Sequence, residues 1–90
     1  MIFYITCEQN AKEITTSLQK NDMANCYVNP LIFLSHLDFD NFDKDDLMEL
    51  RFDILQNCDR LIVSGEITET IKTEIDFAKL VKMEIEYLAQ

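Results

Sequence analysis

The stretch that decides the fold is RLIVSGEITETIKTEIDFAKLVKMEIEYL, residues 60–88. It opens with the apolar run RLIVS, which is typical of a buried strand, and Gly65 ends that strand. Thr68 can cap a helix that we expect to run to about Lys82. The alternating segment 83–88 then predicts a half-exposed strand at a sheet edge. A strand, a helix and another strand in succession indicate a parallel β-α-β unit.

The same alternation extends back to the N-terminus. The apolar run IFYITC at residues 2–7 predicts a strand buried on both faces. Asn10 can cap a helix that ends near Lys20, with Glu13 as its reciprocal partner. Next we predict a strand over 25–28, stopped by Asn29-Pro30, and an irregular segment over 31–43 with room for a short helical turn. A helix then follows the acids at 43, 45 and 46 and carries an apolar stripe to Cys58. The strand over 60–64 completes the order.

This order of elements predicts an α/β fold. We expect residues 1–90 to form a single Rossmann-like or flavodoxin-like domain, with about three helices on a four-stranded parallel sheet of strand order 2-1-3-4. In such sheets ligands bind beyond the carboxyl ends of the strands, where the strand order reverses. That point lies between the first and third strands. Residues at the strand ends and at the start of the last helix are therefore the candidate ligand-binding residues: Cys7, Glu8, Asn29, Pro30, Ser64, Gly65 and Thr68.

Composition narrows the classes of function. Apolar residues make up 48% of the 90 residues, which is enough for one core, and 17 acids against 8 bases give a net charge of −9. Direct nucleic-acid binding is disfavoured, because affinity for phosphate comes from Lys and Arg, whereas a basic protein partner is allowed. No segment approaches the roughly 20 apolar residues that span a bilayer. The N-terminus has no basic region and no small-residue cleavage site, so we expect a cytoplasmic protein without membrane contact.

The cysteines, the single histidine and the aromatic residues of the irregular segment indicate neither a metal site nor a cofactor site. Cys7, Cys26 and Cys58 are widely spaced and form no CxxC pair, which disfavours a disulfide framework or a zinc site and predicts three buried thiols. His36 is the only histidine, and we interpret it as a surface residue rather than a metal ligand or general base. The aromatic residues of the irregular segment are predicted to pin it to the core rather than to form a lid: Phe33, Phe39 and Phe42.

Glu74 stands out in the predicted last helix. On a helical wheel with about 100° per residue it falls between Ala78 and Val81, inside the apolar arc that Ile71 and Ile75 complete. A carboxylate withdrawn from water needs a partner or a raised pKa, which makes it a candidate functional group. The alternative is that Glu74 lies at the rim of the arc and reaches water along its stem.

The second half of the chain resembles a known family. Residues 48–79 contain Met48-Glu49-Leu50, then Cys58-Asp59, Gly65, and Glu74-Ile75 with Ala78. In this pattern, and in Asn29-Pro30 after the second strand, the chain is similar to small nucleoside 2-deoxyribosyltransferase-like proteins. The resemblance implies a Rossmann-like fold, a nucleoside or nucleotide ligand, and a homodimer as one assembly. It also implies that Glu74 is the nucleophile that attacks the anomeric carbon and holds the sugar covalently, as in a retaining glycosidase.

Five residues at four sites depart from active members of that family. Arg51 stands where they carry Asp, Thr68 where they carry an acid, Thr70 where they carry Gly, and Glu8-Gln9 where they carry Gly-Pro or Ser-Pro. Asp53 lies about 160° from Arg51 on the wheel and is a poor substitute for the missing acid. The sequence therefore leaves catalysis by deoxyribosyl transfer or N-glycosidic cleavage open.

Two hypotheses follow. The first is a nucleoside 2-deoxyribosyltransferase-like domain that binds a nucleoside or nucleotide, with or without catalysis through Glu74. The alternative is a non-enzymatic acidic interaction protein or inhibitor, of phage or mobile-element type, that binds a basic protein partner. A hollow beside Glu74 would favour the first, and acids gathered on one face would favour the second.

Overall fold

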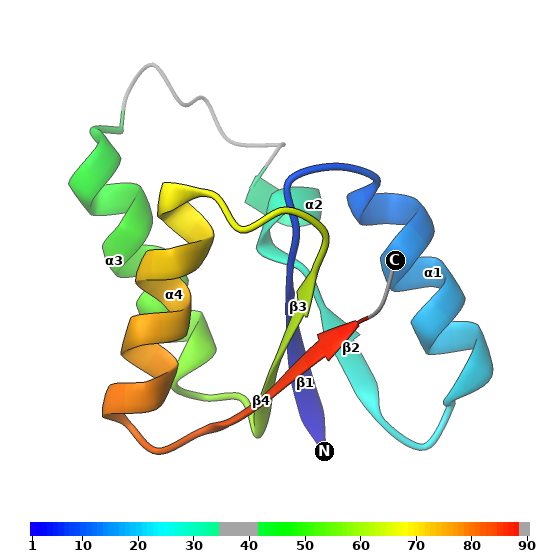
Figure 1. The fold of residues 1–90 in the computed structure, drawn as a ribbon. Helices are drawn as coiled ribbons and strands as arrows, with labels where there is room; N and C mark the ends of the chain where they lie inside the picture. Colours follow the sequence, from blue (N-terminus) through cyan, green and yellow to red (C-terminus); the bar gives the residue numbers. More distant parts are fainter. Residues whose placement is uncertain (35–41, 89–90) are drawn as a thin grey trace.

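The computed structural model describes residues 1–34 and 42–88, which are coloured in Figure 1. The predictions for His36 and Phe39 lie outside these residues, and so does the prediction for the side chain of Phe33.

Four strands form one parallel sheet: β1 (Ile2–Thr6), β2 (Cys26–Val28), β3 (Arg60–Ser64) and β4 (Glu84–Leu88). Their order is β2-β1-β3-β4, so the predicted α/β fold and strand order are confirmed. Tyr4 marks the register, because it pairs with Val28 of β2 and with Leu61 of β3. The continuous apolar runs of β1 and β3 suit their central place, where both faces of each strand are covered.

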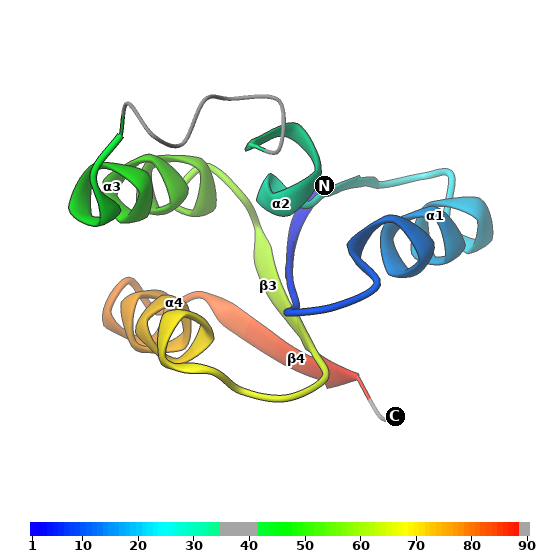
Figure 2. The same cartoon turned by 90° about the horizontal axis from the view of Figure 1, so that it is seen from above.

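Within residues 1–34 and 42–88, four helices connect the strands: α1 (Ala11–Asn21), α2 (Pro30–Leu34), α3 (Lys44–Leu55) and α4 (Glu69–Leu80). Seen from above, α3 and α4 lie on one face of the sheet and α1 lies on the other (Figure 2). The short α2 is the helix beyond the three expected, and it begins at Pro30, whose fixed φ suits a first helical position. None of the helices in the described ranges is long and apolar enough to cross a membrane.

The core has one part on each face of the sheet. On the α1 face, Ile14 and Leu18 of the helix pack against Phe3, Ile5 and Ile62 of the two central strands. On the opposite face, side chains of β1 and β3 pack against α3 and α4. The buried residues of this larger cluster are Tyr4, Leu55, Leu61, Val63, Ile71, Ile75 and Ala78.

The helix caps were predicted only in part. The Thr68 side chain accepts a hydrogen bond from the backbone N–H of Ile71, which confirms its cap on α4. The prediction for Asn10 is wrong, because its φ is 61° and its side chain makes no capping hydrogen bond. A capping side chain reaches the helix amides from an extended backbone, whereas Asn10 turns the chain in the left-handed conformation that Asn tolerates.

Three predictions of burial are also corrected. Val81 is 45% exposed, because α4 ends before it. Cys7 is buried as expected, but Cys26 is exposed at the edge strand β2 and Cys58 is only half-buried. In β4 the half-exposed edge is confirmed, because Tyr87 is 55% exposed whereas Leu88 packs against the core.

Candidate ligand-binding site

The carboxyl ends of β1 and β3 lie side by side, as the register of Thr6 with Val63 shows. The chain leaves β1 toward α1 on one face and leaves β3 toward α4 on the other face (Figure 2). Neither connection crosses the strand ends between them. This divergence is the physical reason that parallel sheets bind ligands at such a point.

A polar hollow of about 290 Å³ lies between the two connections. We call it the β1–β3 hollow. Gly65 lines it and has a φ of 82°, which lets β3 turn away sharply without a Cβ in the way. The two carboxylates Glu8 and Glu66 are exposed at its rim. Its full lining is Glu8, Gln9, Asn10, Ile14, Ser64, Gly65 and Glu66.

A second hollow of about 260 Å³ lies on the side of α2, α3 and α4. We call it the Arg51 hollow. Leu31 of α2 and Ile71 of α4 give it apolar walls, and Arg51 of α3 is the one cation among its lining residues. Glu8 lines both hollows, so the two adjoin. The remaining lining residues are Cys7, Thr68 and Thr70.

Most of the predicted ligand-binding residues line these hollows. Ser64 and Gly65 line the first, Cys7 and Thr68 line the second, and Glu8 lines both. Asn29 and Pro30 are buried and line neither hollow.

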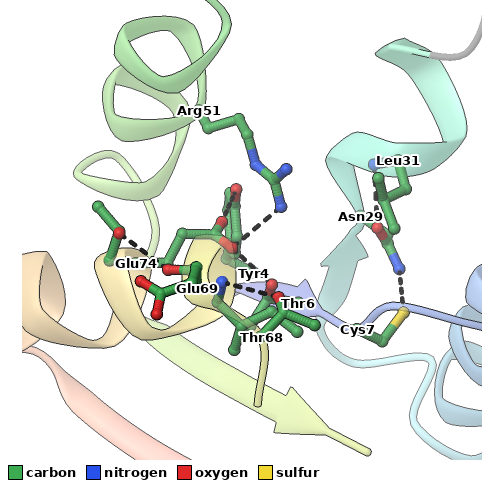
Figure 3. Close-up of polar contacts among 11 residues, drawn as sticks. Tyr4, Thr6, Cys7, Asn29, Leu31, Arg51, Thr68, Glu69 and Glu74 are labelled. Atoms are coloured by element: carbon green, nitrogen blue, oxygen red, sulfur yellow. Dashed lines mark hydrogen bonds and ion pairs between the residues drawn. The ribbon is translucent and has the colours of Figure 1, made fainter. Parts of the chain in front are cut away.

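Asn29 instead contacts Cys7 and Leu31, which line the Arg51 hollow. Its side-chain amide donates to Cys7 Sγ at 3.5 Å and to Thr15 Oγ1 at 3.3 Å, and its Oδ1 accepts from the backbone N–H of Leu31 at 3.1 Å. These contacts fix the start of α2 against β1 and α1. Figure 3 shows the contacts of Asn29 with Cys7 and Leu31.

Glu74 is fully buried, so the alternative in which it reaches water is excluded. Its Oε1 accepts from Thr6 Oγ1 at 2.6 Å and from Arg51 Nη2 at 2.9 Å, and its Oε2 accepts from the hydroxyl of Tyr4. Figure 3 shows these partners converging on the carboxylate from β1 and α3. Glu74 lines neither hollow, whereas its partner Arg51 lines the second.

The pKa values of Tyr4 and Arg51 follow from their burial beside Glu74. Burial raises the pKa of Tyr4 far above its usual value, and the neighbouring charge of Glu74 raises it further, so the phenol keeps its proton. Burial alone would lower the pKa of Arg51, but the charge of Glu74 and the hydrogen bonding of Tyr4 and Glu74 outweigh it and the pKa is raised. Arg51 therefore stays a cation and forms a salt bridge with Glu74, with 11% of the Arg51 side chain exposed.

This geometry limits what Glu74 can do. A carboxylate acting as a nucleophile needs one oxygen free to approach the anomeric carbon, about 3–3.5 Å away. Each oxygen of Glu74 already accepts at least one hydrogen bond from a buried or nearly buried donor. In this structure the Glu74 carboxylate of α4 therefore links that helix to β1 and α3 by hydrogen bonds.

Arg51, Tyr4 and Thr6 were not singled out as partners of Glu74 by sequence reasoning. The sequence did contain a signal for Arg51. It lies four residues from both Leu47 and Leu55, so it falls on the apolar side of α3. Glu74 falls on the apolar side of α4 in the same way. No comparable signal marks Tyr4 or Thr6, which are ordinary members of a buried strand.

Asp53 points to solvent, as its exposure shows, and it takes no part in the site. Among the residues that the structure describes, no group of His, Cys, Asp or Glu could hold a metal ion.

The fold and the two hollows define an α/β domain of Rossmann-like architecture with a candidate small-molecule site at the carboxyl edge of its sheet. Comparison with known proteins finds no family, no curated protein and no solved structure that matches the chain.

Proposed function

We propose that this domain binds a nucleoside in the two adjoining hollows at the carboxyl edge of its sheet. The observation that carries the proposal is their position, where β1 and β3 diverge and the strand order reverses. Together the hollows fall within the roughly 300–1,000 Å³ of small-molecule pockets.

The two hollows differ in a way that suits the two parts of a nucleoside. The β1–β3 hollow offers a hydroxyl from Ser64 and carboxylates from Glu8 and Glu66, which hydrogen-bond to sugar hydroxyls. The Arg51 hollow has the apolar walls Leu31 and Ile71, which suit the flat faces of a base. The carboxylates at the rim also repel phosphate, so the proposal favours a nucleoside over a nucleotide.

Binding without sugar transfer fits the state of Glu74. The carboxylate is buried, paired with Arg51 and absent from both hollows. The proposal therefore gives Glu74 the role of a positioning residue that holds Arg51 in the wall of its hollow. Deoxyribosyl transfer remains a prediction of the family resemblance.

A thermal-shift and NMR titration with ribo- and 2-deoxynucleosides tests the binding. We expect a rise in Tm and shifts of backbone amides near Ser64 and Gly65. Glu8→Gln should weaken binding at least about threefold, because a hydrogen bond that a sugar hydroxyl donates to a neutral amide oxygen is worth less than one donated to a carboxylate. Glu13→Gln on α1 is the matched control, since Glu13 is exposed and lines neither hollow.

Two outcomes would contradict the proposal. If no nucleoside changes the Tm or the amide shifts, the domain is not a nucleoside-binding protein. If free base accumulates during incubation with a 2-deoxynucleoside, and Glu74→Gln abolishes it, then the domain is catalytic and the positioning role of Glu74 is wrong.

A second candidate function has a specific observation behind it. Four exposed carboxylates fall within an arc of about 100° on α3, which is the outward face of that helix. They are Asp45, Asp46, Glu49 and Asp53. Such a face supports the alternative of an interaction protein that binds a basic protein partner.

Capture of cell proteins on the immobilised chain tests this second candidate. We expect bound basic proteins at low salt that are released as ionic strength rises, because exposed charges are screened. The double variant Glu49→Lys and Asp53→Lys should lose them. Asp76→Lys on the exposed side of α4 is the control that should keep them. Capture that survives high salt, or that the α3 variant leaves unchanged, would reject this candidate.

A further inference from the structure

We infer that Arg51 makes the site selective for bases with a carbonyl oxygen, the 6-oxo purines and 4-oxo pyrimidines, over their amino counterparts. The inference rests on the proposed binding of a nucleoside and adds the chemical class of its base. It concerns the Arg51 hollow alone.

The first step is the state of the Arg51 guanidinium. It carries five N–H donors and no acceptor. Its Nη2 donates to Oε1 of Glu74, and Tyr4 is a further hydrogen-bond neighbour. The buried Nε has no hydrogen-bond partner among the described residues. Arg51 thus enters the wall of the hollow with donors to spare.

The second step is that the guanidinium is held in place. Its side chain is only 11% exposed, and the salt bridge to Glu74 fixes its orientation. Glu74 is itself fixed by Tyr4 and Thr6 of β1. Figure 3 shows the guanidinium on the side of α3 that faces Leu31 of α2, which lines the same hollow. A fixed donor selects its partner more strictly than a mobile one, because it cannot turn away to water.

The third step is the rest of the lining. Leu31 and Ile71 offer no polar side-chain group. The Thr68 oxygen accepts from the N–H of Ile71, and its hydroxyl hydrogen and second lone pair are left to offer a ligand. The hydroxyls of Thr68 and Thr70 can both donate and accept, whereas Arg51 is the one lining side chain that only donates. The carboxylate of Glu8 is exposed and borders both hollows, so it is a rim group that the β1–β3 hollow shares.

The consequence for the base follows from hydrogen bonding. A carbonyl oxygen accepts from the guanidinium, as guanine oxygen does in many protein–DNA contacts. An exocyclic amino group in the same place sets donor against donor and leaves buried N–H groups unpaired. A site built to pair one polar group discriminates strongly against an analogue that leaves its own groups unpaired.

Two matched pairs of nucleosides test the inference by calorimetric titration. Inosine and adenosine differ at position 6 of the purine, and uridine and cytidine differ at position 4 of the pyrimidine. We expect inosine and uridine to bind at least about tenfold more tightly than their amino partners.

Substitutions then assign the preference to Arg51. Arg51→Lys keeps a donor-only cation opposite Glu74, and it should keep the preference. In the double variant Arg51→Gln with Glu74→Gln no buried charge is left unpaired, and the Gln at position 51 offers an acceptor as well as donors. Its preference should fall to about twofold or less. The ratio of affinities is the decisive quantity, because a general loss of packing lowers both affinities together.

The outcomes separate the inference from the function on which it rests. Equal affinity within each pair, or tighter binding of adenosine and cytidine, overturns the inference and leaves nucleoside binding intact. A preference that persists in the double Gln variant overturns the role of Arg51. If neither member of either pair binds, the inference and the proposed function fail together.

Discussion

Glu74 is a fully buried carboxylate at the inner face of α4. Withdrawing a carboxylate from water is costly unless hydrogen bonds and an opposite charge compensate. Here Arg51 supplies the charge, and hydroxyls from Tyr4 and Thr6 supply the other hydrogen bonds. The three partners come from two separate elements, so the group also fixes α3 and α4 relative to β1.

Removing the cation alone should therefore be strongly destabilising. We expect Arg51→Met to lower the free energy of unfolding by about 3–5 kcal/mol, because it leaves a buried carboxylate without its countercharge. The double variant Arg51→Met with Glu74→Gln should recover much of that loss, since no buried charge remains. Urea unfolding followed by circular dichroism measures both. A single variant as stable as the parent would show that the salt bridge contributes little.

Tyr4 should give the domain an alkaline limit. An unfolded tyrosine releases its proton near pH 10, whereas in the folded protein burial and the charge of Glu74 raise the pKa of Tyr4 well above that value. Above pH 10 the unfolded state therefore binds fewer protons than the folded state, and the free energy of unfolding falls as pH rises. Below pH 10 this contribution is fully present.

Tyr4→Phe isolates this effect. The variant should be less stable than the parent at pH 8, because it loses a hydrogen bond to Glu74. By pH 11 the difference between the two proteins should shrink by about 1.4 kcal/mol, which corresponds to one pH unit above the unfolded pKa. Other groups that titrate in this range, such as Tyr27 and Cys58, are common to both proteins and cancel in the difference. A difference that stays constant between pH 8 and pH 11 would contradict the role of Tyr4.

At the scale of the element, the end of α4 carries a residue in a conformation that it does not favour. Lys82 has a φ of 60°. The backbone N–H of Met83 donates to the carbonyl of Ala78 at 2.9 Å, and that of Lys82 donates to the carbonyl of Lys79 at 3.1 Å. These two bonds form a Schellman motif, in which the left-handed position is usually Gly.

Lys82→Gly should stabilise the domain by about 1 kcal/mol, because Gly enters the left-handed region without a Cβ clash. Lys82 is exposed and lies far along the chain from the residues that line the two hollows. Lys82→Ala is the matched control and should not stabilise, since Ala keeps the Cβ. Thermal unfolding measures both variants. If Gly brings no gain over Ala, the left-handed turn does not limit the stability of α4.

At the scale of the whole molecule, stability is concentrated in the middle of the sheet. β1 pairs with β2 and β3, and β3 pairs with β1 and β4, so each central strand is hydrogen-bonded on both sides. Helices cover both faces of these strands (Figure 2). β4 lies at an edge, and three of its five residues are exposed.

Native-state hydrogen exchange should follow this arrangement. The amides of Ile5 and Ile62 should exchange only by global unfolding, whereas β4 should open locally at a lower free energy. Exchange of each amide as a function of urea, followed by NMR, distinguishes the two modes. Protection of β4 equal to that of β3 would indicate that its free edge is covered in solution.

Much of this architecture follows from local pattern. The apolar runs of β1 and β3, the alternation of β4 and the cap at Thr68 each depend on residues within one element, so the succession of these elements could be predicted. The strand order then followed from the right-handed crossovers of β-α-β units. The predictions that failed depended on neighbours. Asn10 turns the chain between β1 and α1, and Cys26 is exposed because it begins a strand of three residues at a sheet edge.

The amino-acid sequence by itself determined the alternation of strands and helices, the place where the sheet could hold a ligand, and the unusual position of Glu74 on an apolar face. Only the tertiary structure decided what Glu74 does there. Its partners lie 23, 68 and 70 residues away along the chain. Periodicity within a helix shows which side of it is buried, but a buried carboxylate and its donors meet only when β1, α3 and α4 pack together.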